Sequence, residues 1–219
     1  MLFLQLHSKG IIMKPKTLFY CALCCFFAWS SMQAQVGIGT TDPNAELEIE
    51  TTNTGIPALQ LNPQSSPNGT ETGQLAVIGD KLYMFDNTRK KWLSTETVPI
   101  TFSRTNSLSA ATLRCAGNVT QINSGPIMPF DGTVVAITGN SNNNSSSSNP
   151  SKEFDLRIRN GSSTNTTVDF NLSNYTIVDT TQNVDFSAGE HFTVRTLDLD
   201  GSGDTVNNPT VTIWIKWRG

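Results

Sequence analysis

Strict alternation of apolar and polar residues is the dominant pattern in the second half of the chain. Apolar residues occupy every second position in two neighbouring runs, 154–158 and 168–172, and Asn160-Gly161 lies between them. A period of two residues is that of a β-strand with one buried face. Asn-Gly is a favoured two-residue hairpin turn. The pattern therefore predicts an antiparallel hairpin.

Further β-rich runs lie at 132–138, 175–178, 184–186, 192–194 and 211–217. In the last run Val211, Ile213, Ile215 and Trp217 share one face, which we expect to be buried. The alternation slips between 194 and 199, which predicts a β-bulge near Arg195-Thr196. About eight strands of this pattern between residues 97 and 219 predict an antiparallel β-sandwich or jelly roll.

An earlier β-rich region, 73–86, has apolar side chains on both faces. Leu82 alternates with Met84, and Tyr83 with Phe85, after the two-residue turn Gly79-Asp80. An isolated hairpin is at best marginally stable in water, and two apolar faces need cover. This hairpin must pack on the C-terminal domain or on copies of itself, so Tyr83 and Phe85 are candidate interface residues.

The composition agrees with an all-β fold. Charged residues are 15% of the chain, and no stretch after residue 35 shows a sustained 3.6-residue apolar period. Much of the remainder is Asn, Ser, Thr and Gly, residues that favour turns and disfavour helix interiors. Heptads are missing as well, which argues against a coiled-coil stalk.

The first 34 residues have the pattern of a cleaved signal peptide. Lys14 and Lys16 precede an apolar run at 18–29, and small residues lead to a cleavage position after Ala34. Met13 is a candidate for the true start. The apolar run is too short to span a bilayer, which takes about 20 residues. We therefore expect export, to the cell surface or the medium, and no membrane span.

The mature chain then begins with VGIGTTDPNAELEI at residues 36–49. This stretch resembles a motif that follows the signal peptide in many secreted proteins of Bacteroidota and in phage tail-fibre-like proteins. Residues 73–86 and Lys91-Trp92-Leu93 resemble the hairpin and the closing element found downstream in such proteins. The resemblance implies a fibre or surface-display context and no particular reaction.

Three regions are predicted: a signal peptide at 1–34, a fibre-like β segment at 35–96 and a C-terminal β-sandwich at 97–219. The strand pattern of the last region resembles TNF/C1q-like jelly rolls and the head domains of phage fibres. Those domains commonly form trimers, so the resemblance implies a homo-oligomer, a trimer in particular.

The charge of the chain excludes some partners. Loss of the leader, with Lys9, Lys14 and Lys16 and no acidic residue, changes the formal charge from −3 to −6. Nucleic acid and anionic membranes attract basic surfaces, so neither is an expected partner.

Few residues of the mature chain could carry catalysis. Outside the leader there is one histidine, His191, and one cysteine, Cys115. A Ser-His-Asp or Cys-His site would need His191, and no nucleophile motif surrounds it. Zinc would require more His or Cys ligands. We expect a protein that is not an enzyme.

One acidic loop resembles the start of a calcium loop. Asp198, Asp200 and Asp204 lie in a Gly-rich stretch, and Pro209 stands where an EF-hand would place its closing Glu. Two interpretations stay open: a solvated turn between the last two strands, or a structural Ca²⁺ site.

Trp214 lies on the otherwise polar face of the last strand. It could be a single aromatic half covered by a loop, part of an oligomer interface, or a sugar-stacking residue. Two functions follow from the sequence. The first is an exported adhesive or fibre-like surface protein that oligomerises and binds a glycan or protein. The alternative is a secreted, monomeric carbohydrate-binding module with Trp214 and Tyr175 as its platform.

Overall fold

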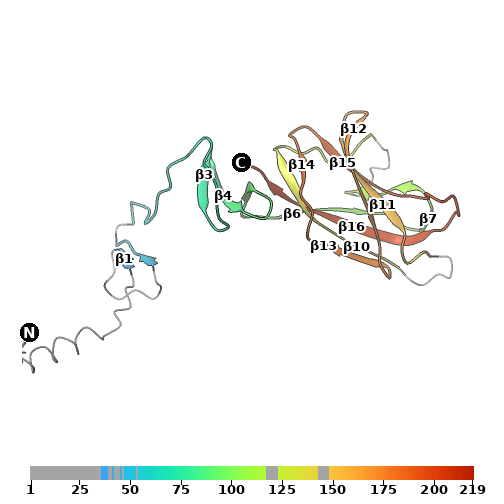
Figure 1. Ribbon diagram of the computed structural model, residues 1–219, viewed down its shortest axis with the longest axis horizontal. Coiled ribbons are helices and arrows are strands. Elements are labelled where there is room, and N and C mark those ends of the chain that lie inside the picture. Colours follow the sequence, from blue (N-terminus) through green and yellow to red (C-terminus); the bar gives the residue numbers. More distant parts are fainter. Residues whose placement is uncertain are drawn as a thin grey trace, which may run out of the picture. The chain divides into compact units, whose positions relative to one another are not determined.

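The computed structural model describes residues 36–38, 41, 45, 47–52, 54–116, 123–142 and 148–219. All regular elements of these residues are strands, so the predicted all-β class is confirmed (Figure 1). The chain divides into two compact units, Met1–Gln60 and Leu61–Gly219. The predicted signal peptide at 1–34 lies outside the described residues.

The first unit contains one pair of short strands. Strands β1 (Val36–Ile38) and β2 (Leu47–Ile49) are parallel, with Val36 opposite Leu47 and Ile38 opposite Ile49. Both Ile38 and Leu47 are exposed. The strand predicted around Leu47 and Ile49 is therefore present, and it pairs with the segment Val36–Ile38.

The second unit contains the remaining strands. Their bounds are β3 (Leu75–Ile78), β4 (Lys81–Asp86), β5 (Lys91–Ser94), β6 (Val98–Ser103), β7 (Ser107–Leu108), β8 (Ala111–Thr112), β9 (Arg114–Cys115), β10 (Gly132–Asn142), β11 (Glu153–Asn160), β12 (Ser163–Asn171), β13 (Thr176–Asp179), β14 (Val184–Phe186), β15 (His191–Thr196) and β16 (Val206–Trp217).

Two of the sheets form a sandwich. The larger has the order β13-β10-β16-β6-β9, with β14 also paired to β10 and β7 to β16. The smaller has the order β12-β11-β15-β8. Every strand pair within these two sheets is antiparallel. The predicted antiparallel sandwich is the arrangement found.

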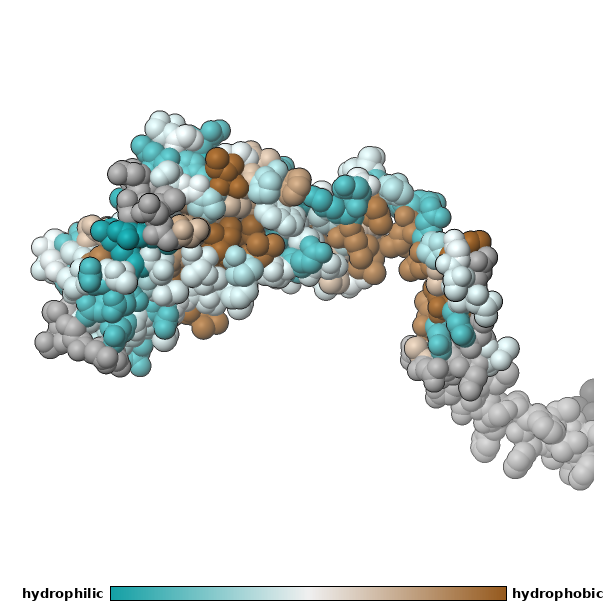
Figure 2. Space-filling model, turned by 180° about the vertical axis from the view of Figure 1, so that it is seen from behind, coloured by the Kyte–Doolittle hydropathy of each residue, from teal (hydrophilic) through white to brown (hydrophobic). Residues whose placement is uncertain are grey.

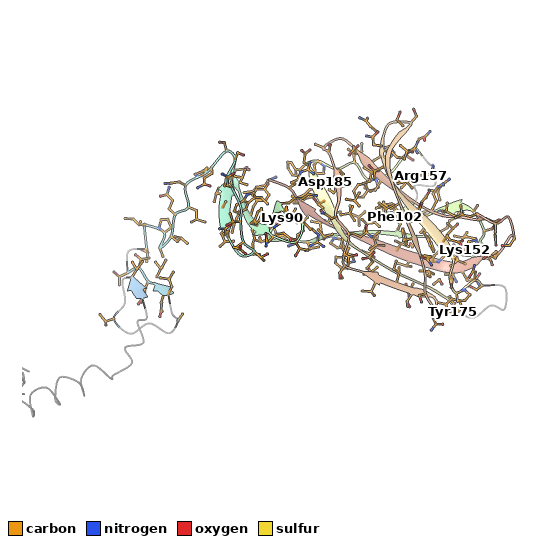
Figure 3. The ribbon with its side chains drawn as sticks, viewed as in Figure 1. Lys90, Phe102, Lys152, Arg157, Tyr175 and Asp185 are labelled. Carbon is orange, nitrogen blue, oxygen red and sulfur yellow. The ribbon has the colours of Figure 1, made fainter. Side chains whose placement is uncertain are left out.

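The core lies between the two sheets. Val211, Ile213 and Ile215 of β16 are fully buried, as the alternation predicted. They belong to one cluster with apolar residues of β11 and β15 in the opposite sheet. Figure 3 shows Phe102 of β6 directed into the same space. Burial of alternate side chains on both sheets is the main source of stability in such a sandwich.

The predicted β-bulge near Arg195-Thr196 is wrong. Strand β15 pairs with β11 in unbroken register from His191 to Thr196 and then ends. The alternation slips because residues 197–200 leave the strand. Register shifts occur instead in β10, at Val134/Ala136 and Asn140/Asn142, and between Ile158 and Arg159 in β11.

A separate three-stranded sheet, β3-β4-β5, belongs to the same compact unit as the sandwich. Its first turn is Gly79-Asp80, and only Gly79 has a positive φ, of 63°. That pattern is typical of the predicted type II′ turn. The compact unit thus begins at Leu61, whereas the sequence placed the start of the C-terminal domain at residue 97.

One face of this sheet is covered by the chain itself. Tyr83 and Phe85 are 6% and 5% exposed. Gly69 packs directly on the Phe85 ring, and Trp92 donates its indole N–H to the Pro67 carbonyl over 2.8 Å. Tyr83 and Phe85 are therefore buried within the chain itself, one of the two kinds of packing that the sequence left open for this hairpin.

Arg89, in the turn between β4 and β5, fixes the three-stranded sheet to the sandwich. Its guanidinium donates hydrogen bonds to three backbone carbonyls, those of Gln182 (2.9 Å), Val135 (3.0 Å) and Thr180 (2.9 Å). It also pairs with Asp86 at 2.8 Å. The fork of the guanidinium serves several acceptors at once, which an ammonium group cannot reproduce in the same geometry.

We expect Arg89→Ala to lower the free energy of unfolding by about 2 kcal/mol, because it leaves the partly buried carbonyls of Val135 and Gln182 without a donor. Arg89→Lys should have a smaller effect. Chemical denaturation of both variants measures these changes. Arg114→Ala, at an exposed arginine, is the control. Equal losses in Arg89→Ala and Arg114→Ala would contradict the role given to Arg89.

Candidate functional site

A groove lies where the three-stranded sheet meets the sandwich. It has a volume of about 460 Å³. The lining residues come from the β3–β4 turn and β4, from the link after β5, from the loop before β10, and from the end of β16. They are Asp80, Lys81, Leu82, Ser94, Thr95, Glu96, Phe130 and Trp217.

Hydrogen bonds at the end of β16 hold the two walls of the groove together. The Ser94 hydroxyl donates to the Glu96 carbonyl over 2.8 Å and accepts the backbone N–H of Trp217 at 3.0 Å. The N–H of Gly219 donates to the carbonyl of Trp92 at 3.1 Å. Because Ser94 is buried, these bonds are shielded from water, and the groove is preorganised.

Aromatic side chains form one wall. Phe130 and Trp217 make an edge-to-face contact, with ring centroids 5.7 Å apart and planes at 83°. Phe130 is 48% exposed, which is high for a phenylalanine. The ammonium of Lys81 lies 3.2 Å from the Phe130 ring centroid, a cation–π contact.

Two carboxylates complete the lining. Asp80 and Glu96 are both exposed. Within the described residues no ion pair or side-chain hydrogen bond engages either carboxylate, and Lys81 has no carboxylate partner. The groove therefore contains two carboxylates that can accept hydrogen bonds from a ligand. Beside them is the Phe130 ring, which contacts the Lys81 ammonium.

The acidic loop predicted from the sequence does bring its three carboxylates together. One oxygen each of Asp198, Asp200 and Asp204 lies within 4.8 Å of the others. Asp198 accepts a hydrogen bond from the Ser109 hydroxyl at 3.0 Å, and Asp200 accepts the Ser202 N–H at 3.0 Å. Hydrogen bonds from Ser202 hold the pKa of Asp200 below its usual range.

A buried lysine, Lys152, forms an ion pair with one carboxylate of this cluster. This residue was not identified from the sequence. Lys152 has a fully buried side chain, and its ammonium lies 2.5 Å from an Asp204 carboxylate oxygen and 2.9 Å from the Asp204 carbonyl (Figure 3). Asn149 donates to the other carboxylate oxygen. The hydrogen bond from Lys152 is the largest cause that lowers the pKa of Asp204. Part of the charge that a cation would balance is thus balanced by Lys152.

Trp214 lies on the outer face of the larger sheet, opposite Ala136 and Pro99. Its side chain is half-buried, and the indole N–H donates to the Thr138 hydroxyl at 2.8 Å. The polar atom of Trp214 is therefore engaged within the chain. Tyr175 is engaged in the same way, since its hydroxyl donates to the Ser148 carbonyl at 3.3 Å.

His191 and Cys115 are placed away from any catalytic arrangement in the described residues. His191 begins β15, where it is 6% exposed. Burial, with a contribution from the nearby Arg159 charge, lowers the pKa of His191. Cys115 is half-buried in β9, and burial raises the pKa of its thiol. A protonated thiol is a poor nucleophile.

Comparison with known proteins adds little. No model of a known protein family matches the chain, and a search of curated proteins finds no match. One solved structure with slight similarity is described as "Crystal Structure of FLHE". It has 11% sequence identity and a TM-score of 0.29 over 57% of this chain and 100% of that chain, too low to bear on fold or function. Within the described residues no helix is long and apolar enough to cross a membrane.

We expect Asp204→Ala to lower the free energy of unfolding by about 3 kcal/mol, because it leaves the buried Lys152 ammonium without its counter-charge. Asp200→Ala is the matched control in the same loop. Since Asp200 is exposed and repels Asp204, its removal should lower the free energy of unfolding far less than Asp204→Ala does. Similar losses in both variants would contradict the assigned role of Lys152.

The same ion pair makes stability depend on pH. The folded-state pKa of Asp204 lies below its ordinary value of 3.8, so the contribution of the ion pair to stability is complete above about pH 4 and is lost as pH falls through the lower folded value. Thermal unfolding of the wild type and of Asp204→Ala between roughly pH 2 and pH 5 measures this dependence of stability on pH. The wild type should lose more stability on acidification than the variant does.

Calcium tests the predicted metal site directly. For a structural Ca²⁺ site, millimolar CaCl₂ should raise the melting temperature of the wild type and not that of Asp200→Asn, because binding to the folded state alone stabilises it. Magnesium chloride at the same ionic strength is the control. An unchanged melting temperature would identify the loop as a solvated turn braced by Lys152.

Proposed function

We propose that this chain is an exported, non-enzymatic surface or fibre-like protein whose β-sandwich unit forms a homo-oligomer and binds a partner. Export and the fibre context are supported by the pattern of residues 1–34 and by the motif at 36–49. Oligomerisation is supported by one face of the three-stranded sheet.

That face is apolar and is exposed over part of its area. Val77 and Met84 are half-buried, and Leu93, which lies opposite Met84 on the same face, is buried. Leu75 pairs with Met84, and Val77 with Leu82, so the four side chains share one side of the sheet. Leu75 is 53% exposed and Leu82 is 43% exposed. Figure 2 shows exposed hydrophobic surface over this part of the chain. The opposite side, with Tyr83 and Phe85, is buried within the chain.

A second copy of the chain is the occupant that we propose for this face. The sheet is held to the sandwich by Arg89 and by Lys91, whose ammonium lies 2.6 Å from Asp185. An apolar face that is held in place loses little conformational entropy when a partner covers it. Adjacent exposed leucines on a rigid sheet are typical of an interface and costly to leave in water.

The alternative, a secreted monomeric carbohydrate-binding module, has less support. It relied on Trp214 and Tyr175 as stacking platforms. Each of them has its polar atom hydrogen-bonded within the chain. They also lie on different strands, β16 and the approach to β13.

Light scattering of residues 35–219 tests the proposal. We expect a stable oligomer, a trimer in particular, in the wild type. The double variant Leu75→Asp/Leu82→Asp should be monomeric with an unchanged circular dichroism spectrum, because charges on the face oppose its burial. Val178→Asp is the matched control, since Val178 is 77% exposed on the sandwich instead. A monomeric wild type, or an oligomer that survives the double substitution, would overturn the proposal.

A further inference from the structure

We propose that the groove between the three-stranded sheet and the sandwich binds a basic side chain, an arginine or a lysine, of a protein partner. This inference rests on the proposed function, because it names the chemistry of the partner that the sandwich unit binds. It uses different residues from the proposed oligomer face, apart from Leu82 at the edge of the groove.

The first argument is the contact that the groove already contains. The Lys81 ammonium lies 3.2 Å from the centroid of Phe130. Among the described residues no carboxylate lies within ion-pair distance of Lys81, although Asp80 and Glu96 line the same groove. The position over Phe130 is therefore a place where a cation resides, held by the negative face of the ring.

The second argument is charge. Two carboxylates and one ammonium line the groove, which leaves one negative charge in excess. The predicted mature chain is itself acidic, with a formal charge of −6 once the three leader lysines are removed. A basic ligand is attracted by both the local and the overall charge, and an acidic one is repelled.

The third argument is shape. The volume of about 460 Å³ lies within the range of ligand pockets, which is about 300–1,000 Å³. The methylene groups of an arginine can lie on Phe130 and Trp217, while its guanidinium reaches the carboxylates at the rim. Guanidinium groups stack on aromatic rings and bind carboxylates through two hydrogen bonds, so arginine fits both halves of the lining.

Two other grooves, formed by described residues of this unit, lack this combination. One on the outer face of the larger sheet is lined by Thr, Asn, Gly, Ile and Val residues and has no charged side chain. Another, beside β12, has Glu153 and Asp169 near Phe170 but is smaller, at about 160 Å³. Asp169 therefore provides a matched control carboxylate outside the proposed site.

The test uses residues 35–219 and argininamide as the probe, with citrullinamide as its uncharged control. Indole N–H resonances are followed by NMR at constant ionic strength, and Trp217→Phe assigns the signal of Trp217. Argininamide should shift the Trp217 signal in a saturable way, and citrullinamide should not. Asp80→Asn/Glu96→Gln should weaken binding by roughly fivefold or more, whereas Asp169→Asn should leave it unchanged.

The variant Lys81→Met tests whether the Lys81 ammonium and a basic ligand compete for the Phe130 ring. It removes the cation that occupies Phe130 and raises the negative excess, so argininamide should bind more tightly, by roughly threefold or more. Weaker binding in Lys81→Met, or equal binding of citrullinamide, would overturn the inference. So would a Trp217 shift produced by cello- or malto-oligosaccharides but not by argininamide, which would identify a glycan groove instead.

These results are separable from the oligomer. Light scattering of Asp80→Asn/Glu96→Gln should give the wild-type mass, because neither residue lies on the face formed by Leu75, Val77, Leu82 and Met84. Loss of argininamide binding with an intact oligomer would support the groove alone. An oligomer with no argininamide binding in the wild type would overturn the groove and leave the proposed function standing.

Discussion

Strand β16 hydrogen-bonds to β10 along one edge and to β6 and β7 along the other, and the two sheets of the sandwich are arranged around it. Val211, Ile213 and Ile215 on its inner side have no exposed surface. Their burial requires the second sheet to lie over them, which fixes β11 and β15. The far end of β16 continues to Trp217, whose backbone N–H is bound by Ser94 of β5. One strand thus organises the core and also one wall of the groove.

Charged groups at the margins of the sandwich are buried with partners. Asp155, which is 2% exposed, is bound by Arg157 at 2.7 Å and by Arg195 at 2.8 Å. Lys152 and Asp204 form a comparable pair beneath the acidic loop. Burial of a single charge would cost several kcal/mol, so each pair constrains where its strand or loop can lie. These contacts specify the loop geometry more than they add to stability.

The three-stranded sheet has two apolar faces that differ in their exposure to solvent. Residues 64–69 and the C-terminal glycine cover the face of Tyr83 and Phe85, and the face of Leu75 and Leu82 remains exposed. One face thus packs within the chain, and the proposed oligomer would cover the exposed leucines of the other. The groove arises where the same sheet meets β16, so partner binding and oligomerisation would use neighbouring but separate parts of one rigid unit.

Local pattern was enough to predict much of the fold. The period-two runs gave β10, β11, β12 and β16, and Gly79-Asp80 gave a hairpin turn, because side-chain alternation and turn conformation depend on residues close in sequence. The gathering of Asp198, Asp200 and Asp204 was predictable for the same reason. Where β15 ends was not, because the pairing of Thr196 with Phe154 depends on a strand far away in the chain.

Tertiary structure alone decided which of two equivalent faces is buried and which residues meet in the groove. Nothing local distinguishes Tyr83 and Phe85 from Leu82 and Met84, since both pairs are apolar and alternate. Lys81, Glu96, Phe130 and Trp217 are separated by long stretches of sequence, and each looks ordinary by itself. Their juxtaposition follows from β16 returning beside β5, and long-range strand pairing of this kind has no signature in the local sequence.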